Sequence, residues 1–288
     1  MRIIRSPQAM AVWSERLRRE GVKIGLVPTM GALHDGHRTL IRTARLKSDA
    51  LVVSIFVNPT QFAPTEDLAK YPRPIRKDRV LCKEAGVDVC FEPTVAAMYP
   101  EGFQTVVTVP SIARRWEGHT RPQHFSGVAT VVTKLFGMVR PHIAVFGQKD
   151  YQQSALVRQL MKDLNLDVEI LVRPTVRERD GLAMSSRNIY LSTEERRIAP
   201  ILFHALEAGR RAIEAGLTEA ESVQAIMHKV IAGAPMMEID YLAVCDSRTL
   251  EPLMKIDRQA VLLGAIRLGS VRLIDNVLVS RKVARRTT

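Results

Sequence analysis

The chain has 288 residues, 46% of them apolar and 25% charged, and it carries a formal net charge of +12. A chain of this length and composition buries a substantial core, as one large domain or two smaller ones. It has no apolar run near the roughly 18–20 residues of a membrane helix and no apolar signal-peptide core, so we expect a cytoplasmic protein with no membrane partner.

Helix and strand signals alternate through the first part of the chain. Ser6 followed by Pro7 is typical of a helix start. Apolar periodicity predicts helices that end near residues 20, 46, 86, 139 and 164, and apolar strands at 22–27, 50–57, 87–91, 143–146 and 168–172. Uniformly apolar strands between helices are typical of a parallel sheet with helices on both faces. Such a sheet binds ligands beyond the carboxyl ends of its strands.

The pattern changes after about residue 176. Two helices are predicted at 193–215 and 219–232, and apolar segments at 238–245, 259–267 and 270–278 suit an antiparallel sheet. We therefore expect an α/β domain over residues 1–176 that binds nucleotide and substrate, and a smaller α+β domain over residues 177–288 that closes over the site.

The cysteines and the net charge say less about function than the order of helices and strands says about the fold. Cys82, Cys90 and Cys245 are odd in number and lack CxxC spacing, so we expect small buried apolar side chains rather than a disulfide framework or a zinc site. The positive charge fits either a nucleic-acid binder or a basic surface around a site for anionic substrates. A basic cluster near the C-terminal end is predicted to be a solvated tail, and it comprises Arg281, Lys282, Arg285 and Arg286.

The first candidate site is PTMGALHDGH, residues 28–37, which follows a predicted strand and opens a helix. His34 and His37 are three residues apart and so share a face of a helical turn. A helix N-terminus suits a phosphate, and imidazoles there can donate hydrogen bonds as negative charge builds at an α-phosphate. For the pair alone, a surface histidine pair or half of a metal site remains the alternative.

Two other phosphate motifs are disfavoured. Gly31 and Gly36 have the spacing of a P-loop, but His37 and Arg38 stand where that motif requires Lys and Ser or Thr. The chain also lacks the GxGxxG of a dinucleotide site. These differences argue against a Walker-type ATPase and a simple NAD enzyme.

Two further polar segments follow predicted strands. In SIFVNPTQF, Asn58 and Gln61 can bind hydroxyl or carboxylate groups without adding charge, although Asn-Pro is also an ordinary turn. In FGQKD, Gly147 permits close backbone approach and Lys149 suits a phosphate. Asp150 suits either a ribose hydroxyl or a helix cap.

The fourth segment, residues 184–187, lies at the junction of the two predicted domains. Its sequence MSSR places two hydroxyls and a guanidinium in a row, which suits a departing pyrophosphate. Gly181 upstream would allow the segment to move, and a polar interdomain loop is the alternative. Together the four segments predict a nucleotide site at the open edge of a parallel sheet, with a mobile basic loop over the phosphates.

The segments PTMGALHDGH, SIFVNPTQF, YPR, FGQKDYQQ and GLAMSSRNIYLS, in this order and spacing, resemble the pantothenate synthetase family over essentially the whole chain. The first also resembles the HIGH signature that this nucleotidyltransferase superfamily shares with class I aminoacyl-tRNA synthetases, and MSSRN resembles their KMSKS loop. The resemblance implies a Rossmann-like domain, a homodimer, and ATP-dependent condensation of pantoate with β-alanine through a pantoyl-adenylate, with Mg²⁺ accompanying ATP.

By motif position, the resemblance implies that the catalytic residues are His34, His37, Lys149 and Arg187. It implies that ATP is bound by Met30, His34, His37, Gly147, Lys149, Asp150, Val176, Met184, Ser185, Ser186 and Arg187. It places pantoate on Gln61, Gln153 and Asn58, and it places the β-alanine side near Tyr71 and Arg121. At Arg76-Lys77-Asp78, where relatives are often more acidic, only Asp78 is a carboxylate, so no protein ligand is assigned to a metal.

Two other functions remain open. The first is another small-molecule nucleotidyltransferase of the superfamily, such as a cytidylyltransferase or a pantetheine-phosphate adenylyltransferase; the Gln61 and Gln153 pair and the extra C-terminal unit argue against it. The second is a basic RNA-binding module, which would explain the charge and the HIGH-like segment. No anticodon-binding domain or nucleic-acid motif is visible in the sequence, so we expect small-molecule partners and no nucleic acid.

Overall fold

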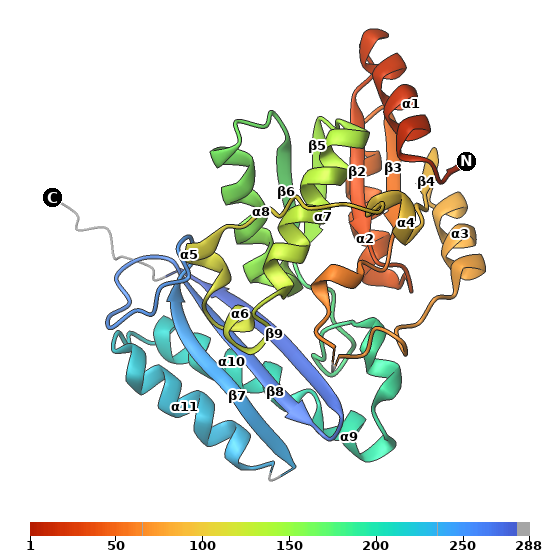
Figure 1. Cartoon of the computed structure of the whole chain (residues 1–288). Helices are drawn as coiled ribbons and strands as arrows, with labels where there is room; N and C mark the ends of the chain where they lie inside the picture. The colour runs from red at the N-terminus through yellow and green to blue at the C-terminus, as the bar shows by residue number, and fades with distance from the viewer. Residues whose placement is uncertain (65, 235, 281–288) are drawn as a thin grey trace, which may run out of the picture. The chain divides into compact units, whose positions relative to one another are not determined.

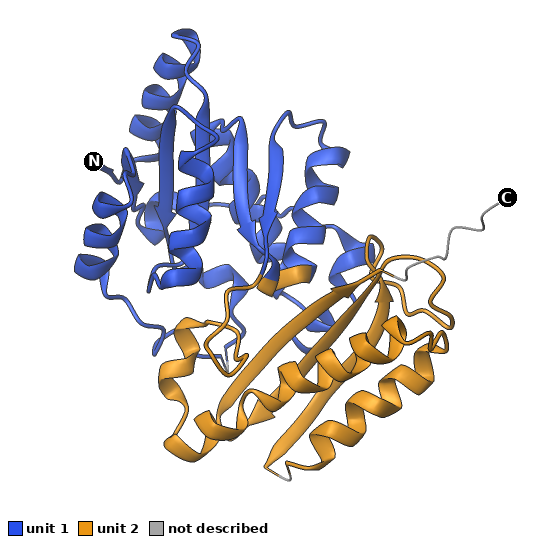
Figure 2. Ribbon diagram, turned by 180° about the vertical axis from the view of Figure 1, so that it is seen from behind, with its two compact units in different colours: residues 1–148, 152–174 blue, residues 149–151, 175–288 orange. Residues whose placement is uncertain are grey.

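The computed structural model describes residues 1–64, 66–234 and 236–280 (Figure 1). The chain divides into two units, the first formed by residues 1–148 and 152–174 and the second by residues 149–151 and the chain from 175 onward (Figure 2). The predicted basic tail lies outside the described residues. Within the described ranges, no helix has the length and apolar character needed to cross a membrane.

The first unit is built on a six-stranded parallel sheet in the order β1-β4-β3-β2-β5-β6. The chain places β3 and β4 on one side of β2 and then β5 and β6 on the other, so the direction of winding reverses between β2 and β5. Ligands of open α/β sheets bind at such a reversal, beyond the carboxyl ends of the strands. The strands are β1 (Arg2–Ile4), β2 (Ile24–Thr29), β3 (Ala50–Ile55), β4 (Val89–Phe91), β5 (Ile143–Gly147) and β6 (Glu169–Arg173).

Helices cover both faces of this sheet (Figure 1). On one face, α2 and α3 pack in a buried cluster with Val27, Leu51 and Val145. Because side chains alternate along a strand, the next residues, Leu26 and Val52, face the other side, where α1 and α7 pack together and α7 contacts β2. The long helices are α1 (Pro7–Arg19), α2 (Asp35–Arg45), α3 (Ile75–Glu84), α7 (His124–Val139) and α8 (Tyr151–Asp163), and the short ones are α4 (Val95–Met98), α5 (Pro110–Ala113) and α6 (Glu117–Thr120).

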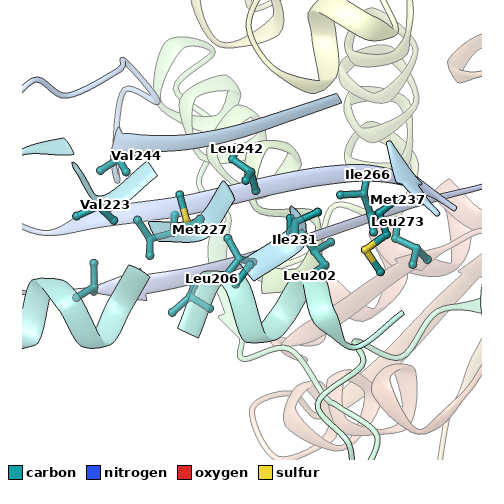
Figure 3. Close-up of a cluster of buried hydrophobic side chains, with 14 of the residues drawn as sticks. Leu202, Leu206, Val223, Met227, Ile231, Met237, Leu242, Val244, Ile266 and Leu273 are labelled. Atoms are coloured by element: carbon teal, nitrogen blue, oxygen red, sulfur yellow. The ribbon is translucent and has the colours of Figure 1, made fainter. Parts of the chain in front are cut away.

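The second unit packs helices against a three-stranded antiparallel sheet, β7-β8-β9. Leucine and methionine side chains of α10 and α11 meet the apolar face of the sheet in one continuous core (Figure 3). In an antiparallel sheet with one covered face, buried and less buried residues alternate along each strand. Strand β9 shows this alternation most clearly. The elements are α9 (Thr193–Ile198), α10 (Ile201–Glu214), α11 (Ala220–Ala232), β7 (Met237–Asp246), β8 (Ala260–Leu268) and β9 (Val271–Val279).

The predicted fold class is confirmed, with differences in detail. The single helix predicted over 193–215 is wrong, because the chain forms α9 and α10 with Pro200 between them. Proline has no N–H for the helix ladder and its ring clashes with the preceding turn. Strand β1 and the short helices were not predicted. Ser6 caps α1 by accepting from the N–H of Ala9 at 3.2 Å, as predicted, and all three cysteines are buried.

Candidate active site

The two histidines of the first motif lie side by side at the start of α2. His34 is the N-cap residue, and its ring centroid is 4.2 Å from that of His37. The Nδ1 of His34 accepts from the N–H of Gly36 at 3.1 Å, and the Nδ1 of His37 accepts from the N–H of His34 at 3.3 Å. The predicted juxtaposition at a helix N-terminus is therefore confirmed, and both rings help to cap the helix.

These contacts fix the tautomer of both rings. An Nδ1 that accepts a hydrogen bond carries no proton, so in each neutral imidazole the proton lies on Nε2. Both histidines are therefore Nε2–H donors when neutral. Hydrogen-bond donors at a helix N-terminus complement the negative charge of a phosphate.

The second motif forms a one-turn 3₁₀ helix, Pro59–Gln61, capped by Asn58. Asn58 is buried, and its Nδ2 donates to the carbonyl of Gly127 and to Oε1 of Gln61, each at 3.1 Å. Its Oδ1 accepts from the hydroxyl of Tyr99 at 2.8 Å and from that of Thr60 at 3.0 Å. Each polar atom of the Asn58 side chain therefore bonds to the protein.

This network also orients Gln61. Because the carbonyl of Gly127 only accepts, the Asn58 nitrogen must face it, and the same nitrogen donates to Oε1 of Gln61. The other end of the Gln61 amide is then the Nε2 donor, which lies 3.2 Å from Sδ of Met30. The contact brings the first and second motifs together at one point.

Arg121, which follows α6, and His124, the first residue of α7, hold the main chain of Gln61. The carbonyl of Gln61 accepts from Arg121 at 3.2 Å and lies 2.9 Å from Nδ1 of His124. Burial, with the positive charge of Arg121, lowers the pKa of His124 to about 4, so this ring is neutral near pH 7. Arg121 also binds both carboxylate oxygens of Glu66, at 2.7 and 2.6 Å.

Tyr71, the other residue assigned to the β-alanine side, is buried in the first unit. Its ring meets the ring of Phe62, one residue beyond Gln61, edge to face at 6.0 Å. It therefore lies beside the turn that carries Gln61. Arg121 and Tyr71 thus both contact the chain around this turn.

The third motif begins at the end of β5, the neighbour of β2. Because β3, β2 and β5 are adjacent and parallel, the segments that follow them emerge at the same edge of the sheet. Gly147 ends β5, and Gln153 lies in the first turn of α8. The segments with the histidine pair, Gln61, Gly147 and Gln153 therefore share this edge of the first unit.

The ATP candidates of the second unit are joined by hydrogen bonds. Val176 accepts from the N–H of Met184 at 3.0 Å, with a bridge between Arg177 and Ala183 inside this hairpin. Ser185 caps the next 3₁₀ turn, Ser186–Tyr190, and its Oγ accepts from the N–H of Arg187 at 3.2 Å. Val176, Met184 and the Ser-Ser-Arg segment are therefore parts of one local structure.

Strand β9 links this hairpin to Lys149. Asp275 forms a two-pronged ion pair with Arg177, at 2.5 and 2.9 Å, and Asn276 donates to the carbonyl of Lys149 at 2.9 Å. Burial raises the pKa of Asp275, and the Arg177 guanidinium opposes that effect. Asp150 lies exposed beside Lys149, with its Oδ1 3.8 Å from the ammonium nitrogen.

Gly181 has a packing role that the sequence did not reveal. Its φ is +96°, and a Cβ at this position would lie 2.4 Å from the ring of Phe203. The guanidinium of Arg177 stacks on the same ring at 3.8 Å. Close approach and left-handed backbone therefore both require glycine here, whereas the sequence suggested only freedom of movement.

Several residues of the candidate site were missed from the sequence. They act through contacts between segments far apart in the chain, and no motif marks them: Tyr99, His124, Gly127, Asp275 and Asn276. Only the Asp-Asn pair that precedes a run of valine and leucine in β9 is unusual for a buried strand.

The winding reversal between β2 and β5, with a histidine-capped helix after β2, defines the class as a Rossmann-like α/β fold of the kind that binds nucleotides at such a reversal. The chain belongs to the pantoate–beta-alanine ligase family, whose model matches residues 2–278.

Named sequence relatives and solved structures agree with this assignment. The chain is 50% identical over 266 residues to a pantothenate synthetase of Syntrophotalea carbinolica, which covers 92% of this chain and 94% of the relative. The crystal structure of pantothenate synthetase from Thermus thermophilus superimposes with a TM-score of 0.92 at 45% identity, covering 96% of this chain and 99% of that one. The pantoate–beta-alanine ligase from Francisella tularensis, complexed with beta-gamma ATP and beta-alanine, gives a TM-score of 0.79 at 35% identity, covering 96% and 97%.

Proposed function

We propose that this enzyme condenses pantoate with β-alanine at the expense of ATP. A pantoate carboxylate oxygen attacks the α-phosphorus of ATP, the bond to the β-phosphate breaks, and pyrophosphate leaves. The amine of β-alanine then attacks the acyl carbon of the pantoyl-adenylate and loses a proton, and the bond to AMP breaks. The adenylate is needed because a free carboxylate is a poor acylating agent and AMP is a good leaving group.

Family membership over residues 2–278 is the observation that carries this proposal. One contact within the first unit supports it, because the segment assigned to ATP and the segment assigned to pantoate meet where Gln61 donates to Met30. A reaction between two bound substrates needs such proximity more than it needs a covalent enzyme intermediate. The enzyme then acts mainly by positioning and by stabilising charge.

His34 and His37 are proposed to donate from Nε2–H to the phosphate oxygens as charge builds at the α-phosphorus. Their tautomer supports this role, since Nδ1 of each ring accepts from the backbone. Lys149 and Arg187 are proposed to complete the catalytic set by holding the phosphates. Ser185 and Ser186 are assigned to the phosphates, Met30, Val176 and Met184 to lining the ATP site, and Gly147 and Asp150 to the ribose.

Gln61 and Gln153 are proposed to bind the hydroxyl and carboxylate groups of pantoate. The amide of Gln61 is held with its Nε2 donor toward the sulfur of Met30, and such a donor suits an anionic hydroxy acid. We assign Asn58 to the pantoate site as the residue that orients Gln61. Tyr71 and Arg121 are assigned to the β-alanine side, beside the Gln61 turn.

Mg²⁺ is proposed to enter bound to the phosphates of ATP, where it would neutralise part of their charge. Among the described residues, no group of three or more His, Cys, Asp or Glu is arranged to hold a metal ion. Mg²⁺ often keeps several waters and is bound through substrate phosphates.

The net charge of +12 is assigned to attraction of anionic substrates rather than of nucleic acid. Binding of mixed RNA at near-physiological salt would contradict this assignment, since nonspecific contacts weaken steeply with salt. We also propose that the enzyme is a cytoplasmic homodimer and that the C-terminal domain closes over bound ATP. Light scattering of the purified protein tests the dimer, and small-angle scattering with and without a non-hydrolysable ATP analogue tests closure.

ATP–pyrophosphate exchange tests the reaction. Labelled pyrophosphate should enter ATP only when pantoate is present and without any need for β-alanine. Pantothenate should form only when ATP, pantoate and β-alanine are all supplied. Exchange that proceeds equally without pantoate would favour another nucleotidyltransferase of the superfamily.

A further inference from the structure

The loop between β2 and α2 has a backbone that needs support. Gly31 has φ +83° and Ala32 has φ +51°, so two consecutive residues are left-handed. This conformation is ordinary for glycine, but for alanine it costs about 1–2 kcal/mol. The loop leads directly to His34, the cap of α2, so its conformation determines where the histidine pair stands.

Asp78 of α3 holds this loop from 45 and 46 residues away. Its Oδ2 accepts from the N–H of Ala32 at 2.9 Å, and its Oδ1 accepts from the N–H of Leu33 at 2.8 Å. Each oxygen thus binds one backbone amide of the strained segment. Hydrogen bonds from N–H groups to a carboxylate are stronger than those between neutral groups.

The contact is tight and buried. Asp78 is only 2% exposed, and burial raises the pKa of its carboxyl, against the opposing effect of the two backbone amides. A Cβ at Gly31 would lie 3.0 Å from Oδ2 of Asp78. A side chain that bonds both amides at such close packing leaves the loop little room to change conformation.

We propose that Asp78 is a positioning residue for adenylation, which fixes residues 31–33 and thereby aims the histidine pair at the α-phosphate. The proposal rests on the proposed function, because it assigns to Asp78 the geometry of His34 and His37. Asp78 acts through the loop and touches neither substrate. It is also distinct from a metal ligand, since its two oxygens are directed at backbone amides.

The test compares Asp78→Asn with Asp49→Asn. Asparagine keeps the shape of Asp78 but turns an NH₂ group toward one of the two N–H groups. Asp49 is an exposed aspartate whose Oδ2 accepts from the N–H of Lys23 at 2.9 Å, at the opposite end of β2. Asp49 makes the same kind of contact between a carboxylate and a backbone amide, but at the edge of the sheet opposite the candidate site.

We expect Asp78→Asn to lower kcat for pantoate-dependent ATP–pyrophosphate exchange about 10–100-fold. A displacement of a catalytic group by about 1 Å lowers the rate by as much as about 10²-fold. The KM for pantoate and the Mg²⁺ concentration at half-maximal rate should stay within about twofold, and Asp49→Asn should match the wild type. A folded Asp78→Asn protein with wild-type kcat would overturn the proposal. Rescue of its rate by added Mg²⁺, or an equal loss in Asp49→Asn, would overturn it as well.

A second measurement uses the wild type and so does not depend on folding of the variant. The amide protons of Ala32 and Leu33 should exchange with deuterium at least about tenfold more slowly than exposed loop amides, because a buried carboxylate binds both. Rapid exchange at both positions would refute the contact itself. If the wild type showed no pantoate-dependent exchange of pyrophosphate but retained this protection, the proposed function would fail while the Asp78 contact stood.

Discussion

Gln61 donates from Nε2 to the sulfur of Met30 across 3.2 Å. Gln61 belongs to the segment after β3 and Met30 to the segment after β2, and sulfur is a weak acceptor that a polar ligand can replace. The donor that is assigned to pantoate is therefore held beside the side chain of Met30, a residue that is assigned to ATP. This relationship connects the sites proposed for the two substrates.

His37 helps to cap α2 and is proposed to donate from Nε2–H, and a matched pair of substitutions separates these two functions. In His37→Asn, the amide oxygen can replace Nδ1 as the acceptor from the N–H of His34, but the Nε2–H donor is lost. In His37→Gln, the amide nitrogen reaches the position of Nε2 and the cap is lost instead. We expect His37→Asn to lower the adenylation kcat about 10²–10³-fold. His37→Gln should retain at least about tenfold more activity than His37→Asn.

Single-turnover formation of pantoyl-adenylate, measured at saturating ATP and pantoate, is the appropriate assay for the two His37 variants. Thermal melting of each serves as the control for the helix cap. Equal rates in both variants would mean that the cap, rather than the Nε2 donor, accounts for the loss.

Gln61→Glu reverses the hydrogen-bonding character of the proposed pantoate site. One carboxylate oxygen can still accept from Nδ2 of Asn58, but the other replaces the Nε2 donor and faces an anionic substrate. We expect the KM for pantoate to rise about 10–100-fold, the equivalent of a lost hydrogen bond to a charged group. The KM for ATP should change less than about threefold.

Gln123→Glu is the matched control for charge, since Gln123 is exposed just before α7. It should leave the pantoate KM within about twofold of the wild-type value. A pantoate KM that is unchanged in Gln61→Glu would remove Gln61 from the site.

Two glycines of α7 should respond oppositely to alanine. A Cβ at Gly127 would lie 2.5 Å from the carbonyl oxygen of Thr60 and 2.7 Å from the N–H nitrogen of Gln61, so backbone must move. We expect Gly127→Ala to destabilise the protein by about 1–3 kcal/mol and to raise the pantoate KM, because the turn that carries Gln61 is displaced.

Gly137→Ala, on the same helix with nothing within 4 Å of the added Cβ, should instead stabilise the protein by about 0.5–1 kcal/mol and leave the KM unchanged. Urea unfolding and steady-state kinetics of both variants make the comparison. Similar behaviour of the two would contradict the close packing of α7 on the Gln61 turn.

The neutral ring of His124 predicts a pH dependence of stability. Its pKa is about 4 in the fold, against 6.5 without burial, so its contribution is fully present above pH 6.5 and is lost as the pH falls toward 4. The difference corresponds to about 3 kcal/mol. In His124→Asn, the amide can still donate to the carbonyl of Gln61 and does not titrate, so this part of the pH dependence should disappear.

Urea unfolding at pH 7.0 and 4.5 measures the effect. Trp13 and Trp116 both belong to the first unit, so tryptophan fluorescence reports on the unit that contains His124. Acid residues elsewhere contribute equally to both proteins, which makes the difference between them informative. Parallel loss of stability in wild type and His124→Asn would contradict a buried neutral ring.

Local sequence was sufficient for every strand of the parallel sheet except β1, and for the positions of the principal motifs. Apolar strands and amphipathic helices can be recognised from the spacing of apolar residues along the chain. Ser6 with Pro7 marks a helix start that depends only on nearby atoms. The histidine pair was predictable for the same reason, since residues three apart at a helix start must meet. Local pattern failed at Pro200, where the periodicity of 193–215 continued through a residue that breaks the helix.

Only the tertiary structure revealed how the site residues are held. Asp78 reaches Ala32 across 46 residues, Asn58 reaches Gly127 across 69, and Asn276 reaches Lys149 across 127. Such pairings depend on which strands become neighbours and at what register, and neither follows from the residues on one segment. The sequence by itself therefore determined which groups are candidates for binding and reaction, because chemistry resides in side chains. The fold decided their orientation, because hydrogen bonds between distant segments fix each donor.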